Sequence, residues 1–212
     1  MHSILEMKQF FLYAFPAMPL ALLGLPLYVY LPTYYAQDIQ LGIFEVGSVL
    51  LVARVFDMLM DPIIGYICDK YLLRKTMMFV GMLFLLSGFY FLTHPSSNAN
   101  YMWLLTFSLL VYLGWSLVSI PYYTLGADIG KEYFENNRYA TFRETFNMLG
   151  VLVALLLPYI YNVTSSPADA LLLMNNDIFL LLPAMLLLFF LQYTHKVLIK
   201  KQYLSLTLIK DL

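Results

Sequence analysis

No side chain between Gln9 and Gln37 carries a charge. A helix needs about 20 mainly apolar residues to cross the hydrocarbon core of a membrane, and this stretch is longer than that. Similar apolar stretches follow, so the sequence predicts six spans, roughly 10–36, 42–67, 75–93, 101–126, 142–162 and 170–195. We therefore expect an all-α membrane protein in which residues 1–195 form a six-helix transmembrane bundle and residues 196–212 form a basic tail or the start of a central loop.

The composition excludes several other classes of protein. The chain is 61% hydrophobic and 12% charged, whereas soluble domains are about 45–50% apolar and about 25% charged. A net charge of −1 provides no basic surface for nucleic acid, and a lone cysteine, Cys68, excludes an internal disulfide framework. The first apolar stretch is too long for a secretory signal, so we expect it to remain as a membrane helix.

The basic residues predict the orientation in the membrane. The expected loops around residues 38–45, 95–100 and 163–177 contain no Lys or Arg. Cytoplasmic loops carry an excess of Lys and Arg, so we expect both termini in the cytoplasm of a multi-pass protein of the inner (plasma) membrane. The basic residues on the expected cytoplasmic side are Lys8, Lys70, Arg74, Lys75, Lys131, Arg138, Lys196, Lys200, Lys201 and Lys210.

Three charged residues, Arg54, Asp57 and Asp61, interrupt the second span. A charge at the bilayer centre costs about 2.5–3.5 kcal/mol on insertion scales, so such residues usually have a function. Their i, i+3, i+7 spacing places them on one helical face. Two acids one turn apart in a dry site repel each other, so one binds a proton or both share a cation. The alternative is an Arg54–Asp57 pair that only joins helices, with Asp61 a backbone partner near Pro62.

This interpretation predicts a site that is stable only when a monovalent cation is bound, which is the basis of ion-coupled transport. Asp57 and Asp61 would hold the cation, and sodium is the one metal ion expected there. Arg54 would keep Asp57 ionised when the cation is absent.

The sequence Arg54-x-x-Asp57-x-x-x-Asp61-Pro62-x-x-Gly65-x-x-x-Asp69-Lys70 resembles the second-helix signature of the glycoside–pentoside–hexuronide:cation symporter family of the major facilitator superfamily. A second segment, Ile120-Pro121-Tyr122-Tyr123-x-Leu125, is similar to the fourth-helix pattern of that family. The loop and fifth-helix pattern follows at Asp128, Tyr133, Arg138, Arg143 and Gly150. The resemblance covers essentially the whole chain and implies the N-terminal six-helix half of a twelve-helix transporter.

The resemblance also implies roles for the coupling residues. It implies that Asp57, Asp61 and a hydroxyl from Ser116 bind the coupling cation. Met60 stands where the family has an asparagine that contributes to sodium binding, so protons are the more plausible coupling ion here.

Other residues are implied to bind the solute. Arg143 matches a fifth-helix arginine near the substrate and the gate, and Tyr123 takes the place of an aromatic residue that stacks on the sugar in one family member. Ser119 and Ala21 stand where the family has sugar-binding aspartates, so galactoside transport is in doubt. We expect conserved coupling machinery with a changed substrate site.

Two further groups of residues are candidates. Tyr28 and Tyr30, beside the helix-kinking Gly24 and Pro26 of the first span, are expected to line a cavity or to belong to an interfacial aromatic belt. Charged residues toward the cytoplasmic side are expected to form gating ion pairs, or else to be solvated loop charges. They are Arg54, Asp69, Lys70, Asp128, Arg138 and Glu144.

These patterns predict one half of a proton- or sodium-coupled secondary transporter that moves a small organic solute, such as a sugar or glycoside, by alternating access. We expect no cofactor; the expected partners are the solute, the lipid bilayer and a missing or separate second six-helix half. The alternative is a truncated, non-transporting membrane remnant or an assembly partner. An intramembrane hydrolase is disfavoured, because acids lie mid-span in one helix only and no histidine lies mid-span.

Overall fold

The computed structural model describes residues 2–71, 73–129 and 133–161, and individual residues between 169 and 183. Every regular element in these ranges is helical, as the apolar pattern predicts. The elements are α1 (His2–Ala14), α2 (Ala17–Leu25), the π-helical segment η1 (Pro26–Tyr30), α3 (Leu31–Gln37), α4 (Ile43–Tyr71), α5 (Arg74–Thr93), α6 (Tyr101–Ile129) and α7 (Tyr133–Ile160).

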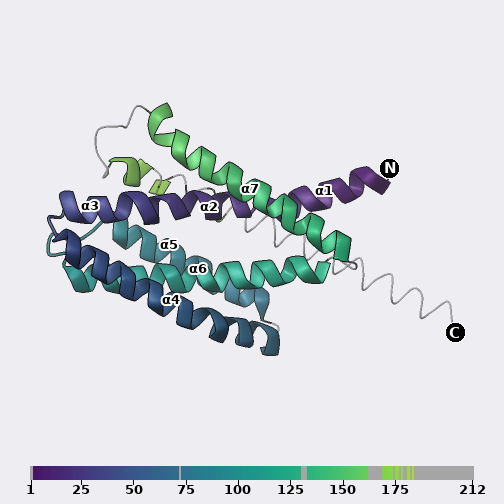
Figure 1. The fold of residues 1–212 in the computed structure, drawn as a ribbon, viewed down its shortest axis with the longest axis horizontal. Helices are drawn as coiled ribbons and strands as arrows, with labels where there is room; N and C mark the ends of the chain where they lie inside the picture. Colours follow the sequence, from purple (N-terminus) through teal and green to yellow (C-terminus); the bar gives the residue numbers. More distant parts are fainter. Residues whose placement is uncertain are drawn as a thin grey trace.

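The helices form two groups that lie side by side (Figure 1). In one group α4 and α5 pack along α6, and in the other α7 packs along α1 and α2. The α4–α5 and α6–α7 connections lie at the end of the bundle where the N-terminus lies, and the α3–α4 and α5–α6 connections lie at the opposite end (Figure 1). Lys70, Arg74 and Arg138 therefore belong to one end of the molecule, as the predicted orientation requires.

Four helical stretches are long and apolar enough to cross a membrane: Gln9–Gln37, Arg74–Thr93, Tyr101–Asp128 and Phe134–Ile160. The chain is therefore a multi-pass membrane protein. Helix α4 is as long as α6 but carries Arg54, Asp57 and Asp61 in its central turns. These charged side chains therefore need partners on neighbouring helices of the bundle.

The first span is a broken helix rather than a regular one. It turns at Phe15 and Pro16 and passes through η1 before α3 begins. Pro26 has no backbone N–H to donate to the preceding turn, and the Leu31 N–H donates to the Pro26 carbonyl oxygen, five residues back. Single π-helical turns of this kind are frequent at functional sites.

Two glycines let pairs of helices approach more closely than any other residue would. A Cβ added at Gly114 of α6 would lie 2.6 Å from Leu85 N and 2.7 Å from Gly81 O of α5. A Cβ at Gly150 of α7 would collide with the Met18 carbonyl oxygen of α2. These contacts are to backbone atoms, which cannot move aside as a flexible side chain does.

Several helix ends differ from the predicted span limits. Helix α7 begins at Tyr133 rather than near residue 142, so Arg138 lies on a helix and not in a loop. This first part of α7 is held by aromatic packing, since the Phe10 ring lies 4.5 Å from Tyr139 and 5.4 Å from Phe142 between centroids. Asp128 likewise falls within α6. Most of the predicted sixth span, 170–195, and the whole tail, 196–212, lie outside the described residues.

Candidate functional site

The charged face of α4 meets α6 at a single serine. Ser116 Oγ lies 2.8 Å from Asp57 Oδ1 and 2.5 Å from Asp61 Oδ1. The serine is 2% exposed, and the Asp57 side chain is 13% exposed. The structure thus brings together the three residues predicted as cation ligands, although their function as a cation site stays a prediction. Asp61 contacts this hydroxyl, which the helix-joining alternative does not predict.

The position of Ser116 follows from the packing of α6. Residues two apart on a helix point to nearly opposite sides. Gly114 is turned to α5, where its missing side chain permits close contact, so Ser116 is turned away from α5 and toward α4. The sequence of α6 therefore places a hydroxyl against the two acids.

Arg54 lies beside this group and is held by three partners. Its Nη1 donates to Asp57 Oδ2 at 3.2 Å. Its guanidinium carbon lies 4.3 Å from the ring centroid of Tyr28 and 4.7 Å from that of Tyr112. We call Arg54, Asp57, Asp61 and Ser116 the α4–α6 polar cluster. Tyr28 comes from η1 and Tyr112 from α6, so Arg54 joins three segments of the chain.

The oxygen atoms of this cluster can bind one proton or one small cation. Carboxylate and hydroxyl oxygens are hard ligands, which suit hard cations rather than soft transition metals. Within the described ranges no group of three or more His, Cys, Asp or Glu side chains is placed to hold a metal ion. A proton or a small cation at these oxygens stays a prediction.

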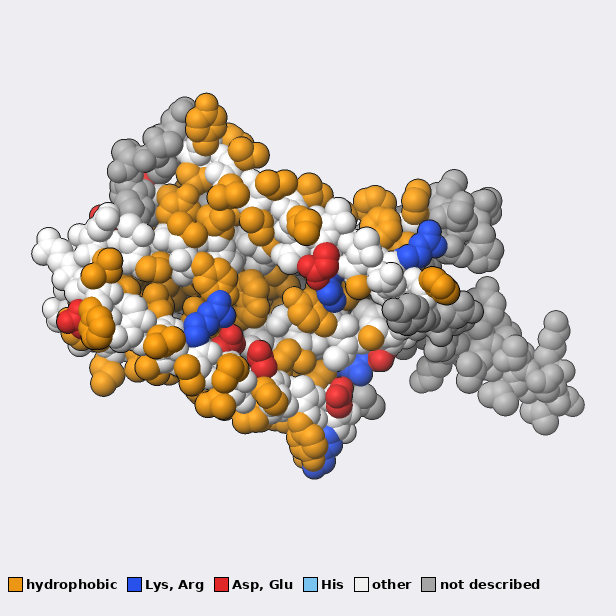
Figure 2. Space-filling model, in the orientation of Figure 1, with side chains coloured by type: hydrophobic (Ala, Val, Ile, Leu, Met, Phe, Trp, Pro, Cys, Tyr) orange, Lys and Arg blue, Asp and Glu red, His pale blue; other side chains and the backbone are white. Residues whose placement is uncertain are grey.

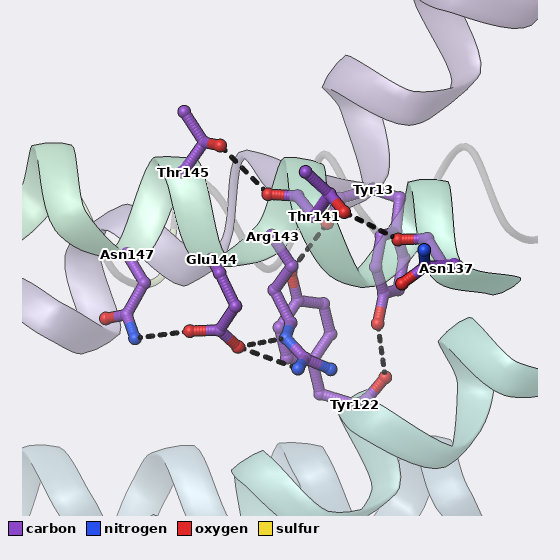
Figure 3. A network of polar contacts seen from close by, with 8 residues as sticks. All are labelled: Tyr13, Tyr122, Asn137, Thr141, Arg143, Glu144, Thr145 and Asn147. Carbon is purple, nitrogen blue, oxygen red and sulfur yellow. Dashed lines mark hydrogen bonds and ion pairs between the residues drawn. The ribbon is translucent and has the colours of Figure 1, made fainter.

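A second polar cluster surrounds Arg143 on α7 (Figure 3). Arg143 Nε and Nη2 donate to Glu144 Oε1 at 3.0 and 2.7 Å, and Asn147 Nδ2 donates to Glu144 Oε2 at 3.3 Å. The Arg143 guanidinium also lies 4.2 Å from the centroid of the Tyr123 ring on α6. The structure thus brings together three residues predicted from the sequence, Arg143, Tyr123 and Glu144.

Two buried tyrosines beside Arg143 were not predicted as part of the site. Tyr13 Oη donates to the Tyr122 carbonyl oxygen at 3.3 Å, and Tyr122 Oη donates to the Tyr13 carbonyl oxygen at 2.6 Å. Their rings stack with centroids 5.0 Å apart. The pair joins α1 to α6 just before the break at Pro16. No local pattern reveals it, because the partners are 109 residues apart.

The predicted gating charges divide into paired and unpaired residues. Asp128 forms an ion pair with Arg74, between α6 and α5. Arg138 lies over the Phe10 ring at 5.3 Å, and the Lys70 ammonium lies 5.4 and 5.3 Å from the ring centroids of Tyr66 and Tyr71. Asp69 belongs to none of the ion pairs that join described residues.

Tyr30 and Ser119 were both predicted to bind substrate, but within the described residues no hydrogen bond or ion pair joins either side chain to the two polar clusters. Tyr30 is partly buried and packs against the core. Ser119 is buried within α6. Their roles stay predictions.

The charged side chains of one face are set among hydrophobic ones. Figure 2 shows Lys, Arg, Asp and Glu side chains over α4 and α7, with a hydrophobic surface between these helices. Helices α4 and α7 also expose apolar side chains, among them Leu51, Val55, Met58, Leu152, Leu155 and Leu156. A charged side chain is costly to expose to lipid, so this face is suited to contact protein or to line a water-filled cavity.

Two comparisons with known proteins bear on the site. A family model described as MFS/sugar transport protein matches residues 12–207, a range that includes both polar clusters. No curated protein matches the chain.

Proposed function

The chain belongs to the MFS/sugar transport protein family, and from that premise we propose that it forms part of a cation-coupled secondary transporter of a sugar or glycoside. The observation that carries the proposal is the contact of one hydroxyl, that of Ser116, with two carboxylates on successive turns of α4. An ion pair that only joins helices needs one carboxylate. A second carboxylate adds a negative charge that a bound proton or cation can neutralise.

The geometry favours a proton as the coupling ion. A serine hydroxyl has one hydrogen to donate, whereas an ionised carboxylate only accepts. Both contacts are hydrogen bonds at the same time only if one carboxyl is protonated and donates to Ser116 Oγ. The 2.5 Å distance to Asp61 lies in the range of a charge-assisted O–H···O bond. The α4–α6 polar cluster is therefore best satisfied when it holds one proton.

Sodium is less well supported by the neighbours of the cluster. Met60 packs in an apolar cluster with Ile64 and with Leu113 and Leu117 of α6. Its thioether supplies no hard oxygen ligand at the position where the resembling family has an amide. This agrees with the preference for protons that the sequence predicts.

Loading of the site provides a mechanism for coupling. With both acids ionised the cluster carries one net negative charge, which is costly to enclose in a low-dielectric space. Binding of one proton neutralises it, so the occluded state that alternating access requires becomes accessible. Transport of the solute is then tied to the downhill movement of the proton.

The second cluster has the properties of a solute site. Aromatic rings with a few placed polar groups are typical of small-molecule sites, and Tyr123 with Arg143 offers both. A sugar can stack its C–H face on the ring and accept hydrogen bonds from the guanidinium. We propose that Tyr28, a residue that is 45% exposed, contributes a second aromatic surface.

The proposal includes a partner and a location. The face over α4 and α7 combines charges with exposed apolar side chains (Figure 2), and transporters of this kind hold the substrate between two repeats. We propose that a second six-helix half covers this face, in an inner (plasma) membrane with the N-terminus on the cytoplasmic side.

Uptake into proteoliposomes tests this function. The whole protein that contains this chain is reconstituted and screened with labelled sugars and glycosides under an imposed proton or sodium gradient. We expect proton-driven accumulation of at least one of these solutes, and its loss in Asp57→Asn and Asp61→Asn. Glu45→Gln, an exposed acid in the first turn of α4, is the matched control and should accumulate the solute normally. Unchanged accumulation in both aspartate variants would refute the assignment.

A further inference from the structure

Arg54 of α4 stacks against aromatic rings that come from two other segments of the chain. Its side chain is 43% exposed, so burial does not hold it in place. The three groups that hold it are the Asp57 carboxylate and the rings of Tyr28 and Tyr112, at 4.3 and 4.7 Å. A planar, weakly hydrated guanidinium is well suited to stacking on aromatic faces.

The two rings come from parts of the chain with other roles. Tyr28 lies in η1, the π-helical turn caused by Pro26. Tyr112 lies one turn before Ser116 on α6, so the two residues share a helical face. One contacts Arg54 and the other contacts the carboxylates. The rings and the acids are therefore parts of one arrangement.

The charges of this arrangement set up a competition for Asp57. Arg54 and a coupling cation are both attracted to the same carboxylate, which Arg54 contacts through Oδ2 and Ser116 through Oδ1. Any group that holds Arg54 near Asp57 lowers the affinity of the site for an added positive charge. Any change that releases Arg54 raises it.

We propose that Tyr28 and Tyr112 are positioning residues that hold Arg54 as a resident counter-ion of Asp57 and thereby set the affinity of the site for its cation. This inference rests on the proposed cation site and goes beyond it by assigning a role to the two rings. It also gives η1 a function. When the cation binds, Arg54 is released from Asp57 and its contacts with the two rings weaken, so loading of α4 is transmitted to the broken first span.

The charged and titratable groups that face Asp57 come from each neighbouring segment. They are Arg54 and Asp61 on α4, Tyr112 on α6 and, through Arg54, Tyr28 of η1, together with the Ser116 hydroxyl. The test therefore has to separate the effect of the rings on Arg54 from a direct effect on the acids.

Trp115 provides a reporter beside Ser116 in the chain. The sequence has two tryptophans, so in a Trp103→Phe background Trp115 is the one tryptophan that this chain contributes. The fluorescence of the whole protein is then titrated with protons or with sodium. We expect Tyr28→Leu and Tyr112→Leu to shift the midpoint toward tighter cation binding by about three- to tenfold, the size that corresponds to one cation–π contact. Arg54→Gln should shift it in the same direction.

Two controls separate positioning from folding. Tyr112→Phe keeps the ring and should retain the reference midpoint, as should Tyr101→Leu, an exposed tyrosine at the start of α6. In an Arg54→Gln background Tyr28→Leu should add nothing, since a double-mutant cycle isolates the shared interaction. A simple structural defect would add its effect in both backgrounds.

The outcomes distinguish this inference from the proposed function. If the fluorescence of the reference protein does not respond to the cation, or if the response persists in Asp57→Asn, the proposed cation site itself fails. If that response is present but the leucine variants titrate like Tyr101→Leu, the positioning role is overturned and the cation site stands. An equal shift from Tyr28→Leu in the Arg54→Gln background would also overturn it.

Discussion

Ser116 is the residue on which the α4–α6 polar cluster depends. Its hydroxyl is the single described group that contacts both Asp57 and Asp61. A hydrogen bond to a charged group contributes about 1.5–3 kcal/mol, so its loss leaves two acids poorly held and free to separate. Both contacts are made by one oxygen atom, Ser116 Oγ, so removing that atom tests its role.

We expect Ser116→Ala to lower proton-driven uptake by about tenfold or more, in line with the loss of one charged hydrogen bond. Ser116→Thr keeps the hydroxyl and should retain most of the uptake. Ser108→Ala is the matched control, because Ser108 is equally buried in α6 and its hydroxyl has no hydrogen-bond partner among the described residues. Initial rates in proteoliposomes measure the effect. Equal rates in the alanine variants at 116 and 108 would contradict it.

The residues of the site were predictable to different degrees. Asp57 and Asp61 were found from their spacing on one helix, and Ser116 was found from the family resemblance. The match to the MFS/sugar transport protein family supports that resemblance at the level of the family. Tyr112 and Tyr13 were not found. Their partners lie on other helices, so their roles depend on how the helices are packed and not on a pattern within one segment.

At the scale of the elements, each of the first five predicted spans overlaps helical elements of the structure, but their details differ from the prediction. The prolines predicted a broken first span, whereas the π-helical form of η1 follows from the carbonyl that Leu31 reaches. The early start of α7 was missed because Tyr133–Phe142 is polar in sequence. Its aromatic residues become apolar contacts only when α1 lies against them.

The contact between α5 and α6 yields a prediction about stability. Gly114→Ala places a Cβ against the backbone of Leu85 and Gly81, so the helices must separate. Overpacking of this kind costs about 1–3 kcal/mol, and we expect a lower midpoint of thermal unfolding in detergent. Gly47→Ala on α4, where a Cβ meets nothing within 4 Å, should leave the midpoint unchanged or raise it. A midpoint for Gly114→Ala equal to that of Gly47→Ala would show that the helices tolerate the added methyl group.

At the scale of the whole molecule, the two ends of the bundle differ in charge. The basic residues Lys70, Arg74 and Arg138 lie at the end that carries the α4–α5 and α6–α7 connections (Figure 1). The connection between α5 and α6, residues 94–100, has no Lys or Arg. Because Lys and Arg are retained on the cytoplasmic side, this difference predicts the orientation of every helix at once.

The chain's own cysteine makes this orientation testable. Cys68 is the single cysteine of the given sequence and is fully buried, so an impermeant maleimide should not label this part of the protein in intact cells. Ser97→Cys, in the exposed α5–α6 connection, should be labelled from outside. Leu73→Cys, exposed between α4 and α5, should be labelled only after the membrane is permeabilised. The opposite result for both positions would invert the topology, and with it the direction in which the α4–α6 polar cluster meets the proton gradient.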